Sequence, residues 1–406
     1  MIGRTNALSA AGVELSLVVS VTTGSVVTAT KGSLSVSGTA YGGSVTLKLP
    51  EAGTWTVVAT YNGQTSDTKT ISVVDSYAVT LTYFSATINV TVPSGATVYL
   101  KKDGTTLQTK TSTGTVAFTV TETGTYTVEA TNGSQTTSGT VSVTSATSYA
   151  LTLAFVSSTL NSNEWDVIRS VSDAGEGANY WSIGDRKAVV LNGTVGALTL
   201  SSVTTYAFII GFNHNSSVEG SGRIHFQLGK TALSGGTDVA LCDSKYGNTG
   251  SDAAFRMNTS NTNSGGWNNS YMRKTICPAF KNVLPAAMQN AIKSVTKYTD
   301  NTGNSSAASA VTATTDEIFL LAEYEVFGTI ARGNTNESSK QAQYAYYSAG
   351  NSKIKYNHSS TSTAVFWWLR SPYSGISTYF VGVGTGGTVN GNGANISSGF
   401  APGFCV

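Results

Sequence analysis

Apolar residues alternate with polar residues through much of the first 156 positions. The alternation is clearest in three runs, formed by Val116, Phe118 and Val120, by Tyr126, Val128 and Ala130, and by Val141 and Val143. A period of two places successive side chains on opposite faces of a β-strand. The pattern therefore predicts short strands, each with one face turned towards a core.

The strand pattern occurs twice. Residues 53–60 and 76–84 recur as residues 124–131 and 148–155. The pairs Asn62-Gly63, Asp103-Gly104 and Asn132-Gly133 fall where hairpin turns are expected, because such pairs accept positive φ angles. Short strands at this spacing predict one β-sandwich per copy. We expect the sandwiches over residues 12–84 and 85–156, after an N-terminal tail of residues 1–11.

Helical spacing appears from residue 157 onwards. A short helix is predicted over 164–169, capped by Ser162 or Asn163 and ended by Gly175. Apolar residues at helical spacing predict a second helix over 282–297, and residues 316–328 form an apolar run that ends in a turn. Strand-like runs lie at 187–191, 205–212 and 223–228. Residues 157–406 are therefore predicted to form an α+β domain with long loops, so that the whole chain is mainly β.

Composition supports this organisation. A length of 406 residues predicts about two to four domains. Forty-three glycines and only 11% charged residues are typical of a turn-rich β protein, while 40% hydrophobic residues are enough for real cores. The formal charge of +2 comes from scattered Lys and Arg, so we expect no binding to nucleic acid.

The ends and the cysteines indicate the compartment. The first residues lack a basic region followed by a continuous apolar run, so no secretory signal is expected. Since no stretch reaches the roughly eighteen apolar residues of a membrane span, we expect no membrane insertion. Cys242, Cys277 and Cys405 are an odd number in a long chain and are expected to be buried, reduced thiols.

The two predicted sandwiches resemble the immunoglobulin-like and carboxypeptidase-regulatory-like modules of bacterial surface and phage tail proteins. The resemblance covers residues 12–156 and rests on the strand Gly-Thr-Tyr/Trp-Thr-Val at residues 53–57 and 124–128. In those proteins such modules are spacers or docking platforms. The resemblance implies a stalk.

The last domain resembles a bacterial and phage family with a Trp-Leu-Arg-Ser-Pro signature. The segments that carry the resemblance are 180–185, 206–212, 316–321, the signature at 366–372 and the closing strand at 399–406. The family looks like the C-type-lectin-like fold of formylglycine-generating-type enzymes and retroelement-diversified receptor-binding proteins. Where its closing strand often has Arg before Pro, this chain has Ala401, so any ion pair of that Arg is not expected.

The signature is interpreted as scaffold. Trp368 and Leu369 would bury large apolar areas, each worth about 1.5–3 kcal/mol against exposure, and Trp367 is assigned to the same scaffold. Arg370 is costly to bury unless a carboxylate or several carbonyls accept its N–H groups. Pro372 ends the strand and sets the exit of the next loop.

The segment that follows is the predicted binding surface. Residues 373–398 carry no charge and are rich in Tyr, Ser, Asn and Gly, which are typical of adaptable binding surfaces. A strand at 378–383, a turn at 384–387 and a return at 388–390 are predicted. The expected ligand-binding residues are Tyr373, Ser374, Ile376, Ser377, Tyr379, Asn390, Asn392 and Asn395, with Ser397 and Ser398 on the same exposed face. The alternative is an ordinary solvated hairpin.

Catalytic patterns are weak. His214, His225 and His358 fall on unrelated segments without metal-ligand spacing. Cys242 and Cys277 lack the paired-cysteine motif of formylglycine-generating enzymes, so that activity is not expected. Asp166, Asp173, Glu176 and Asp185 are interpreted as solvated acids, since no calcium-loop motif accompanies them. We expect no enzyme activity, no metal and no cofactor.

These features predict a phage virion protein, a tail or capsid fibre, whose head recognises a glycan or protein on a bacterial surface. Expected partners are that receptor, other virion proteins through the N-terminal region, and further copies of the chain. One alternative is a structural or decoration protein without a receptor, and another is an enzyme on the lectin-like scaffold that acts on cell-wall glycan. The expected location is the virion, with the bacterial cell surface as the alternative.

Overall fold

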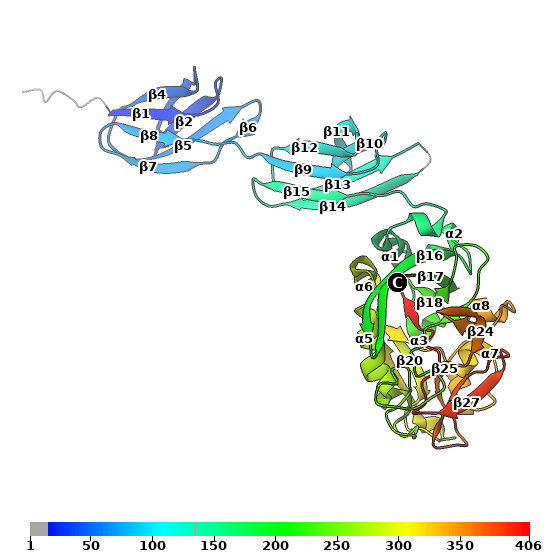
Figure 1. Ribbon diagram of the computed structural model, residues 1–406. Coiled ribbons are helices and arrows are strands. Elements are labelled where there is room, and N and C mark those ends of the chain that lie inside the picture. Colours follow the sequence, from blue (N-terminus) through cyan, green and yellow to red (C-terminus); the bar gives the residue numbers. More distant parts are fainter. Residues whose placement is uncertain (1–14, 134) are drawn as a thin grey trace, which may run out of the picture. The chain divides into compact units, whose positions relative to one another are not determined.

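The computed structural model describes residues 15–133 and 135–406 (Figure 1). The chain is mainly β, as the alternation predicted. It divides into two compact units between Phe155 and Val156. The tail expected over residues 1–11 lies outside the described residues.

The first sandwich is built, within the described residues, from eight strands. They are β1 (Leu15–Ser20), β2 (Val26–Lys31), β3 (Leu34–Thr39), β4 (Ser44–Leu49), β5 (Gly53–Tyr61), β6 (Gln64–Thr65), β7 (Lys69–Val73) and β8 (Tyr77–Thr80). One sheet has the order β4-β1-β8, and the other has the order β3-β2-β5-β6 with β7 also paired to β5.

The second sandwich has the same core topology. Its strands are β9 (Ala86–Thr91), β10 (Thr97–Lys102), β11 (Thr105–Thr111), β12 (Thr115–Val120), β13 (Gly124–Thr131), β14 (Thr136–Val143) and β15 (Ser148–Thr152). The sheets have the orders β12-β9-β15 and β11-β10-β13-β14. β9 pairs antiparallel with β12 and parallel with β15, just as β1 pairs antiparallel with β4 and parallel with β8.

The sequence repeat gives the two sandwiches equivalent core residues. Trp55 on β5 and Tyr126 on β13 are both fully buried. The Trp55 Nε1–H donates to the carbonyl of Glu51 at 3.2 Å, and the Tyr126 hydroxyl donates to the carbonyl of Glu122 at 2.9 Å. The polar group of each buried ring therefore has a hydrogen-bond acceptor, the carbonyl of the residue four positions earlier.

Two of the three predicted turns have the expected backbone. Asn62 and Gly63 have φ angles of 48° and 78°, and Asp103 and Gly104 have 49° and 78°. Two successive positive φ angles are the mark of a type I′ hairpin turn. In the third pair only Gly133, with φ 95°, has a positive φ angle.

The head, residues 156–406, carries the helices of the described chain. They are α1 (Trp165–Asp173), α2 (Gly177–Tyr180), α3 (Ser216–Glu219), α4 (Gly266–Asn269), α5 (Cys277–Lys281), α6 (Ala286–Ala291), α7 (Glu323–Phe327) and α8 (Ala345–Ser348). The 3₁₀ helices η1 (Leu160–Ser162), η3 (Ala308–Ala310) and η4 (Thr335–Ser339) and the π-helix η2 (Met272–Ile276) accompany them.

Several sheets complete the head. Their strands are β16 (Arg186–Val195), β17 (Leu198–Phe212), β18 (Ile224–Lys230), β19 (Val239–Ala240), β20 (Val295–Asp300), β21 (Val311–Asp316), β22 (Ile318–Phe319), β23 (Lys355–Asn357), β24 (Ser360–Val365), β25 (Trp367–Pro372), β26 (Tyr379–Val383), β27 (Val389–Gly393) and β28 (Gly403–Cys405). The sheet orders are β16-β17-β18-β28-β22, β19-β23-β24, β20-β21 and β25-β26-β27.

The helix predicted over residues 282–297 is wrong. Only α6 is an α-helix in that stretch, Pro285 precedes it as the N-cap, and β20 begins at Val295. Val295, Lys297 and Thr299 are buried at every second position of β20, which is a strand pattern. In the sequence, the apolar positions of α6 and of β20 follow one another at intervals that resemble one face of a single helix.

The predicted cap of α1 is also wrong. The helix begins at Trp165 after Glu164, whose side chain makes no capping bond. Asn163 is buried, and its side-chain carbonyl oxygen accepts the N–H of Ser157 at 2.7 Å. Gly175, with φ 74°, follows the end of the helix as predicted.

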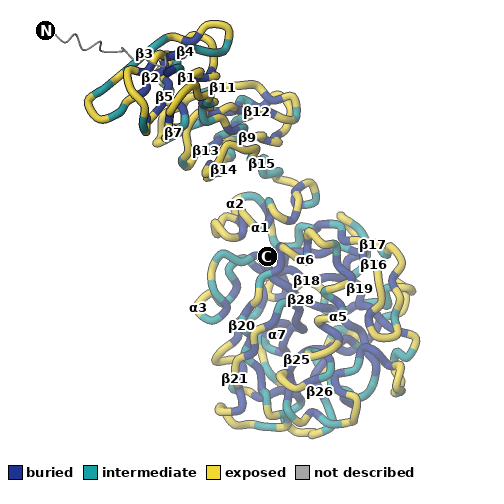
Figure 2. Tube along the Cα trace, turned by 90° about the vertical axis from the view of Figure 1, so that its left-hand side faces the viewer, coloured by how far each residue is buried: buried dark blue, intermediate teal, exposed yellow. Residues whose placement is uncertain are grey.

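Each sandwich and the head has a separate hydrophobic core. In the head the buried segments, dark blue in Figure 2, run through the middle of the domain, where β18 and β28 lie. The closing strand β28 is thus a central strand, paired with β18 on one side and β22 on the other. In the part of the chain that the structure describes, no helix is long and apolar enough to cross a bilayer.

Candidate functional site

The predicted hairpin is present. β26 pairs with β27 from Tyr379–Gly393 to Val383–Val389, so the turn falls at residues 384–388. β25 pairs with the other edge of β26. In both Figure 1 and Figure 2 this small sheet lies at the end of the head away from α1 and α2.

Most predicted ligand-binding residues have accessible side chains at this end. Ile376, Ser377 and Asn390 are exposed. The half-buried members are Tyr373, Ser374, Tyr379, Asn392 and Asn395. The rings of Tyr373 and Tyr379 lie edge to face, with their centroids 6.3 Å apart. We call residues 373–379 with β26 and β27 the hairpin surface.

Ser397 and Ser398 do not belong to this surface, contrary to the sequence prediction. Both are buried. The Ser397 hydroxyl donates to the Asp243 carboxylate at 2.8 Å, and the Ser398 N–H donates to the carbonyl of Phe255 at 2.9 Å. They turn inward because the chain there is already entering the core towards β28.

One buried amide holds the loop between β25 and β26. The Asn263 Nδ2 group donates to the carbonyls of Tyr373, Ile376 and Tyr379 at 3.1, 3.0 and 2.9 Å. The Asn263 backbone N–H also donates to the carbonyl of Ser377 at 2.7 Å. A single residue therefore fixes the loop at four points, although Asn263 is more than a hundred residues earlier in the chain.

A buried carboxylate orders a second loop, residues 331–333, which contacts the loop between β25 and β26. Glu323 accepts the backbone N–H groups of Ala331, Arg332 and Gly333, at 2.6, 3.1 and 2.7 Å. Burial raises the pKa of the Glu323 carboxyl, while these N–H donors favour its charged form. The ordered loop then meets the hairpin surface, because the Arg332 guanidinium donates to the Tyr373 hydroxyl at 2.8 Å and the Arg332 carbonyl accepts the N–H of Ser374.

The Trp-Leu-Arg-Ser-Pro box forms β25 and is buried from end to end. The Trp367 indole donates to the carbonyl of Lys353, and the Trp368 indole donates to the carbonyl of Phe255, both at 2.9 Å. Pro372 is the last residue of the strand. These side chains are out of reach of any ligand and hold the hairpin surface on the core.

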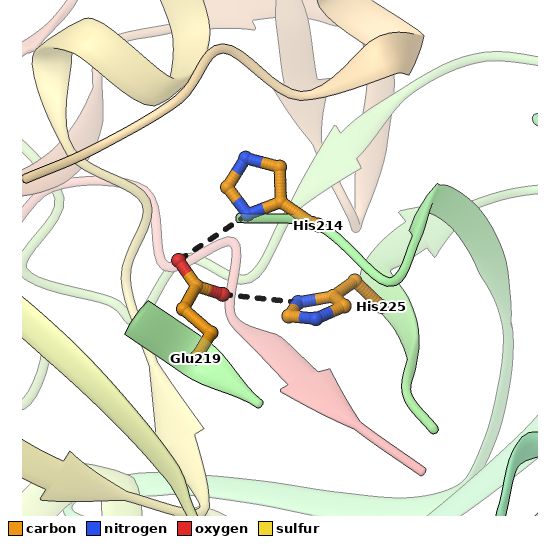
Figure 3. Close-up of side chains that lie close together, drawn as sticks. All are labelled: His214, Glu219 and His225. Carbon is orange, nitrogen blue, oxygen red and sulfur yellow. Dashed lines mark ion pairs between the residues drawn. The ribbon is translucent and has the colours of Figure 1, made fainter. Parts of the chain in front are cut away.

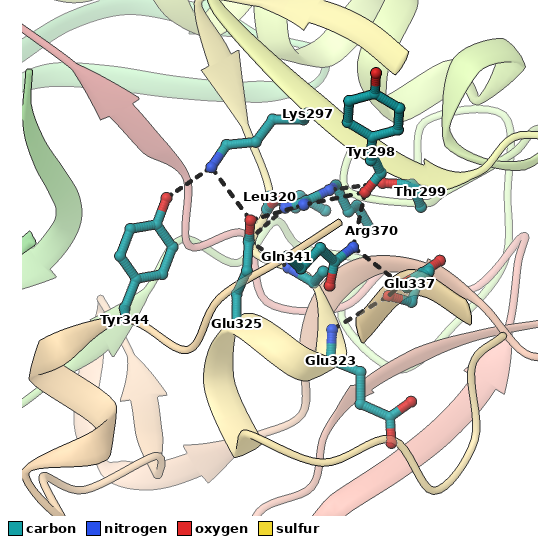
Figure 4. Close-up of polar contacts among 12 residues, drawn as sticks. Lys297, Tyr298, Thr299, Leu320, Glu323, Glu325, Glu337, Gln341, Tyr344 and Arg370 are labelled. Carbon is teal, nitrogen blue, oxygen red and sulfur yellow. Dashed lines mark hydrogen bonds and ion pairs between the residues drawn. The ribbon is translucent and has the colours of Figure 1, made fainter. Parts of the chain in front are cut away.

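Arg370 has the partners that its burial requires (Figure 4). Its guanidinium donates to both carboxylate oxygens of Glu325, at 2.5 and 2.8 Å, to the Thr299 hydroxyl at 2.7 Å and to the carbonyl of Leu320 at 2.8 Å. Burial alone would raise the pKa of Glu325, but Arg370 and Lys297 beside it hold the pKa below the usual value. Two-point contact of this kind is the strongest form of the Arg–carboxylate pair.

The polar network extends from Arg370 to a second set of acids. The Lys297 ammonium donates to Glu219 at 2.9 Å, to Glu325 at 3.2 Å and to the Tyr344 hydroxyl at 2.8 Å. The Glu337 carboxylate accepts the Ser371 hydroxyl at 2.6 Å and the N–H of Asp300 at 2.9 Å. Burial nevertheless raises the pKa of Glu337 to about 7.

The folded chain brings two of the three histidines together, contrary to the sequence interpretation (Figure 3). His214 Nδ1 lies 3.2 Å from one oxygen of Glu219, and His225 Nδ1 lies 3.7 Å from the other. All three residues are buried, and their ligand atoms lie within 4.8 Å of one another. The sequence showed no metal-ligand spacing, because loop 213–223 doubles back between β17 and β18.

The surroundings of this His-Glu-His cluster are unfavourable for a metal ion. His214 Nε2–H donates to the carbonyl of Ala342 at 2.8 Å, which leaves Nδ1 facing the Glu219 carboxylate. The Nδ1 atom itself makes no hydrogen bond to any of the residues that the structure describes. The Lys297 ammonium already occupies the other oxygen of Glu219, and its charge would repel a divalent cation in this buried place. Burial also lowers the pKa of His225 well below its usual value.

The other candidate catalytic groups are placed as expected. Asp166, Asp173 and Glu176 are exposed, and Asp185 is half-buried. Asp173 is paired with Arg169 and Lys293. The three cysteines are buried and unpaired. Burial raises the pKa of Cys242 and of Cys405 to about 12, so neither thiol is a ready nucleophile.

Sequence reasoning missed the residues that support the surface. Asn263, Glu323 and Arg332 carry no motif of their own, and Glu219 and Glu325 became apparent only as partners of buried cations. The one signal in the sequence was Arg370, since a buried guanidinium requires a carboxylate or several carbonyls somewhere in the chain.

Comparison with known proteins finds a family model that matches the C-terminal part. Residues 240–406 match the sequence model of a domain of unknown function, DUF6273. No curated protein matches the chain. Among solved structures, the chain is similar to the minor pilin GBS52 of Streptococcus agalactiae, with 9% identity and a TM-score of 0.24 over 35% of this chain and 95% of the pilin. It is also similar to the Bacillus anthracis TIE protein, with 11% identity and a TM-score of 0.18 over 53% of this chain and 45% of that one.

Proposed function

We propose that the chain is a non-enzymatic display protein whose head binds a receptor on a bacterial surface through the hairpin surface. The observation that carries the proposal is the double support of that surface. Asn263 fixes loop 373–379 through its side-chain amide, and the loop ordered by Glu323 fixes it through Arg332. An exposed loop that only connects two strands does not need such anchoring.

The chemistry of the surface suits binding rather than catalysis. Residues 373–398 contain no charged side chain, so the surface offers no acid, base or charged nucleophile. Tyrosine rings give contact area at small cost in side-chain entropy, and Asn and Ser give adaptable hydrogen bonds. Because the loop is ordered before binding, less entropy is lost when a glycan or protein docks on it.

The proposed setting is a phage particle, in a tail or capsid fibre, with the bacterial cell surface as the alternative. The two sandwiches would form the stalk and attach the head to other virion proteins. Several heads on one particle would add their binding, which compensates for modest affinity at each. The C-type-lectin-like fold and the phage family remain predictions from the sequence motifs.

The experiment that tests this function measures binding of the full chain to a panel of whole bacterial cells. The hairpin variant carries Ile376→Ala, Tyr379→Ala, Asn390→Ala and Asn392→Ala, and spares Tyr373 because Arg332 is bonded to it. The matched control carries Thr361→Ala and Ser362→Ala, which are exposed polar residues on β24.

We expect saturable binding by the wild-type chain and by the control, and a loss of about tenfold or more in the hairpin variant, since interface energy concentrates in a few residues. Circular dichroism verifies that the variant is folded. Equal binding by the hairpin variant would exclude this surface. Absence of binding to every cell type would favour the alternative, a structural protein of the virion without a receptor.

A further inference from the structure

A polar groove lies on a different part of the head, near α1, α6 and α5. Two hollows of about 530 and 480 Å³ are both lined by Ser294 and Glu317, so they adjoin. The larger extends over α5 and η2, and the smaller extends over the end of α1 and the start of β18. In Figure 1, α1, α6 and α5 follow one another along the same side of the head.

Positive charge gathers in this groove. The two hollows are lined by six cations and three acids, which are Arg169, Arg223, Arg273, Lys274, Lys281 and Lys293, and Asp173, Asp316 and Glu317. Six positive and three negative charges leave a balance of +3, whereas the formal charge of the whole 406-residue chain is +2. The groove therefore holds more net positive charge than the rest of the chain together.

Ion pairs inside the groove neutralise only part of this positive charge. Asp173 is shared by Arg169 and Lys293, Arg273 pairs with Asp316, and Lys281 pairs with Glu317. Two cations then remain without a carboxylate among the described residues. They are Lys274, which is exposed and donates to the amide oxygen of Asn269 at 2.7 Å, and Arg223.

Arg223 is the less satisfied of the two. Its Nε and Nη1 atoms are shielded from solvent and have no hydrogen-bond acceptor among the residues that the structure describes. Leaving a buried donor without a partner is unfavourable, and more so for a charged group. Arg223 lines the smaller hollow, so an anion there would compensate the guanidinium charge, and a guanidinium is a strong partner for phosphate oxygens.

We propose that the groove binds a phosphodiester polymer without bases, of the glycerol phosphate kind found on bacterial surfaces. Arg223 lines one hollow and Lys274 lines the other, so two cations are placed along the groove. Such an arrangement suits a polymer that carries a negative charge on each repeating unit. Among the described residues, no Phe, Tyr or Trp lines either hollow. Single-stranded nucleic acid requires aromatic side chains on which its bases stack, so a polymer that lacks bases fits better.

This inference does not depend on the proposed function, because the hairpin surface shares no residue with the groove. The two sites can therefore be tested apart in the full chain. A polymer bound along the groove would also add contact between the head and a cell, beside the receptor at the hairpin surface.

The test is calorimetric titration of the full chain at low salt with poly(glycerol phosphate) and, separately, with inorganic phosphate. The groove variant is Arg223→Gln with Lys274→Gln. The control is Lys245→Gln with Lys340→Gln, which removes the same amount of charge from elsewhere on the head. The hairpin variant is titrated in parallel.

We expect the polymer to bind the wild-type chain, the control and the hairpin variant, and to bind about tenfold more weakly to the groove variant, with an affinity that falls as salt rises. Binding of inorganic phosphate without binding of the polymer would overturn the assignment to a polymer. Equal weakening in control and groove variant, or no binding of either probe, would overturn the groove as a site.

Discussion

At the scale of single residues, the head depends on charges that are buried in pairs. Arg370 and Glu325 are both 0% exposed, and Lys297 and Glu219 continue the pairing. Ions lose several kcal/mol each on leaving water, and their mutual attraction recovers this only with good geometry. The intact network therefore adds little net stability to the head, whereas removing one charge from it is strongly destabilising.

The first prediction concerns Arg370→Met. Removal of the guanidinium leaves Glu325 buried with Lys297 alone, so we expect the free energy of unfolding of the head to fall by about 3–5 kcal/mol. Urea unfolding followed by tryptophan fluorescence measures this, since five of the six tryptophans lie in the head.

The control is the double variant Arg370→Met with Glu325→Leu. It removes both charges of the pair, so its cost is expected to be smaller than that of Arg370→Met alone. If the double variant is instead less stable than Arg370→Met alone, the two charges are not coupled as described.

The second prediction is a pH dependence that comes from Glu337. Burial raises its pKa to about 7 from an ordinary value of 4.5. Between these values the folded chain binds more protons at this site than the unfolded chain does. The contribution of Glu337 to stability is therefore present below about pH 4.5 and is lost as the pH rises through about 7.

Glu337→Gln cannot titrate and imitates the protonated acid. We expect the free energy of unfolding of the variant to rise relative to that of the wild-type chain, by up to about 3 kcal/mol, as the pH increases from 5 to 8. Urea unfolding at several pH values tests this. Glu325 acts in the opposite direction, because its lowered pKa gives stability that is lost at acid pH, so only the difference between the two chains isolates Glu337. Parallel pH curves would refute the prediction.

At the scale of elements, the hairpin surface shows how far local patterns reach. The strand, turn and return of residues 378–390 follow from alternation and glycine, and the structure has β26, a turn and β27 there. The anchoring of the loop before β26 could not be read from the same residues, since its hydrogen-bond donor is Asn263.

The third prediction is that Asn263→Ala releases this loop. The carbonyls of Tyr373, Ile376 and Tyr379 each lose the Asn263 amide, and those of Ile376 and Tyr379 keep one backbone N–H donor. A lost buried hydrogen bond costs about 1–3 kcal/mol. Hydrogen exchange should become faster for the amides of residues 374–379, and cell binding should weaken. Asn261→Ala is the control, because Asn261 is exposed two residues away. Unchanged exchange in the loop would show that Asn263 does not order it.

The failed helix at residues 282–297 shows the limit of periodicity. Apolar positions of α6 and alternate positions of β20 merge into one apparent stripe. A strand is formed at 295–300 because β21 pairs with it along its whole length. Since β21 lies later in the sequence, residues 282–297 alone do not indicate that this strand pairing forms.

At the scale of the whole molecule, each sandwich and the head has its own core. The fourth prediction follows for Trp55→Ala. Loss of this fully buried ring should destabilise the first sandwich by about 3–5 kcal/mol and leave the head unchanged. Hydrogen exchange should become faster in β1 to β8 only. Tyr126→Ala is the counterpart and should affect β9 to β15, whereas faster exchange in the head in either variant would contradict separate cores.

The sequence by itself determined the strands of the sandwiches, their repeat, two of the type I′ turns and the hairpin after the box, because each depends on residues close together in the chain. It also showed that Arg370, if buried, needed a carboxylate or several carbonyls. Only the tertiary structure decided that Glu325 supplies the carboxylate, that Asn263 and Glu323 hold the candidate surface, that Ser397 and Ser398 are buried, and that His214 and His225 meet at Glu219. Those contacts join residues far apart in the chain, and they exist only once the sheets of the head have packed.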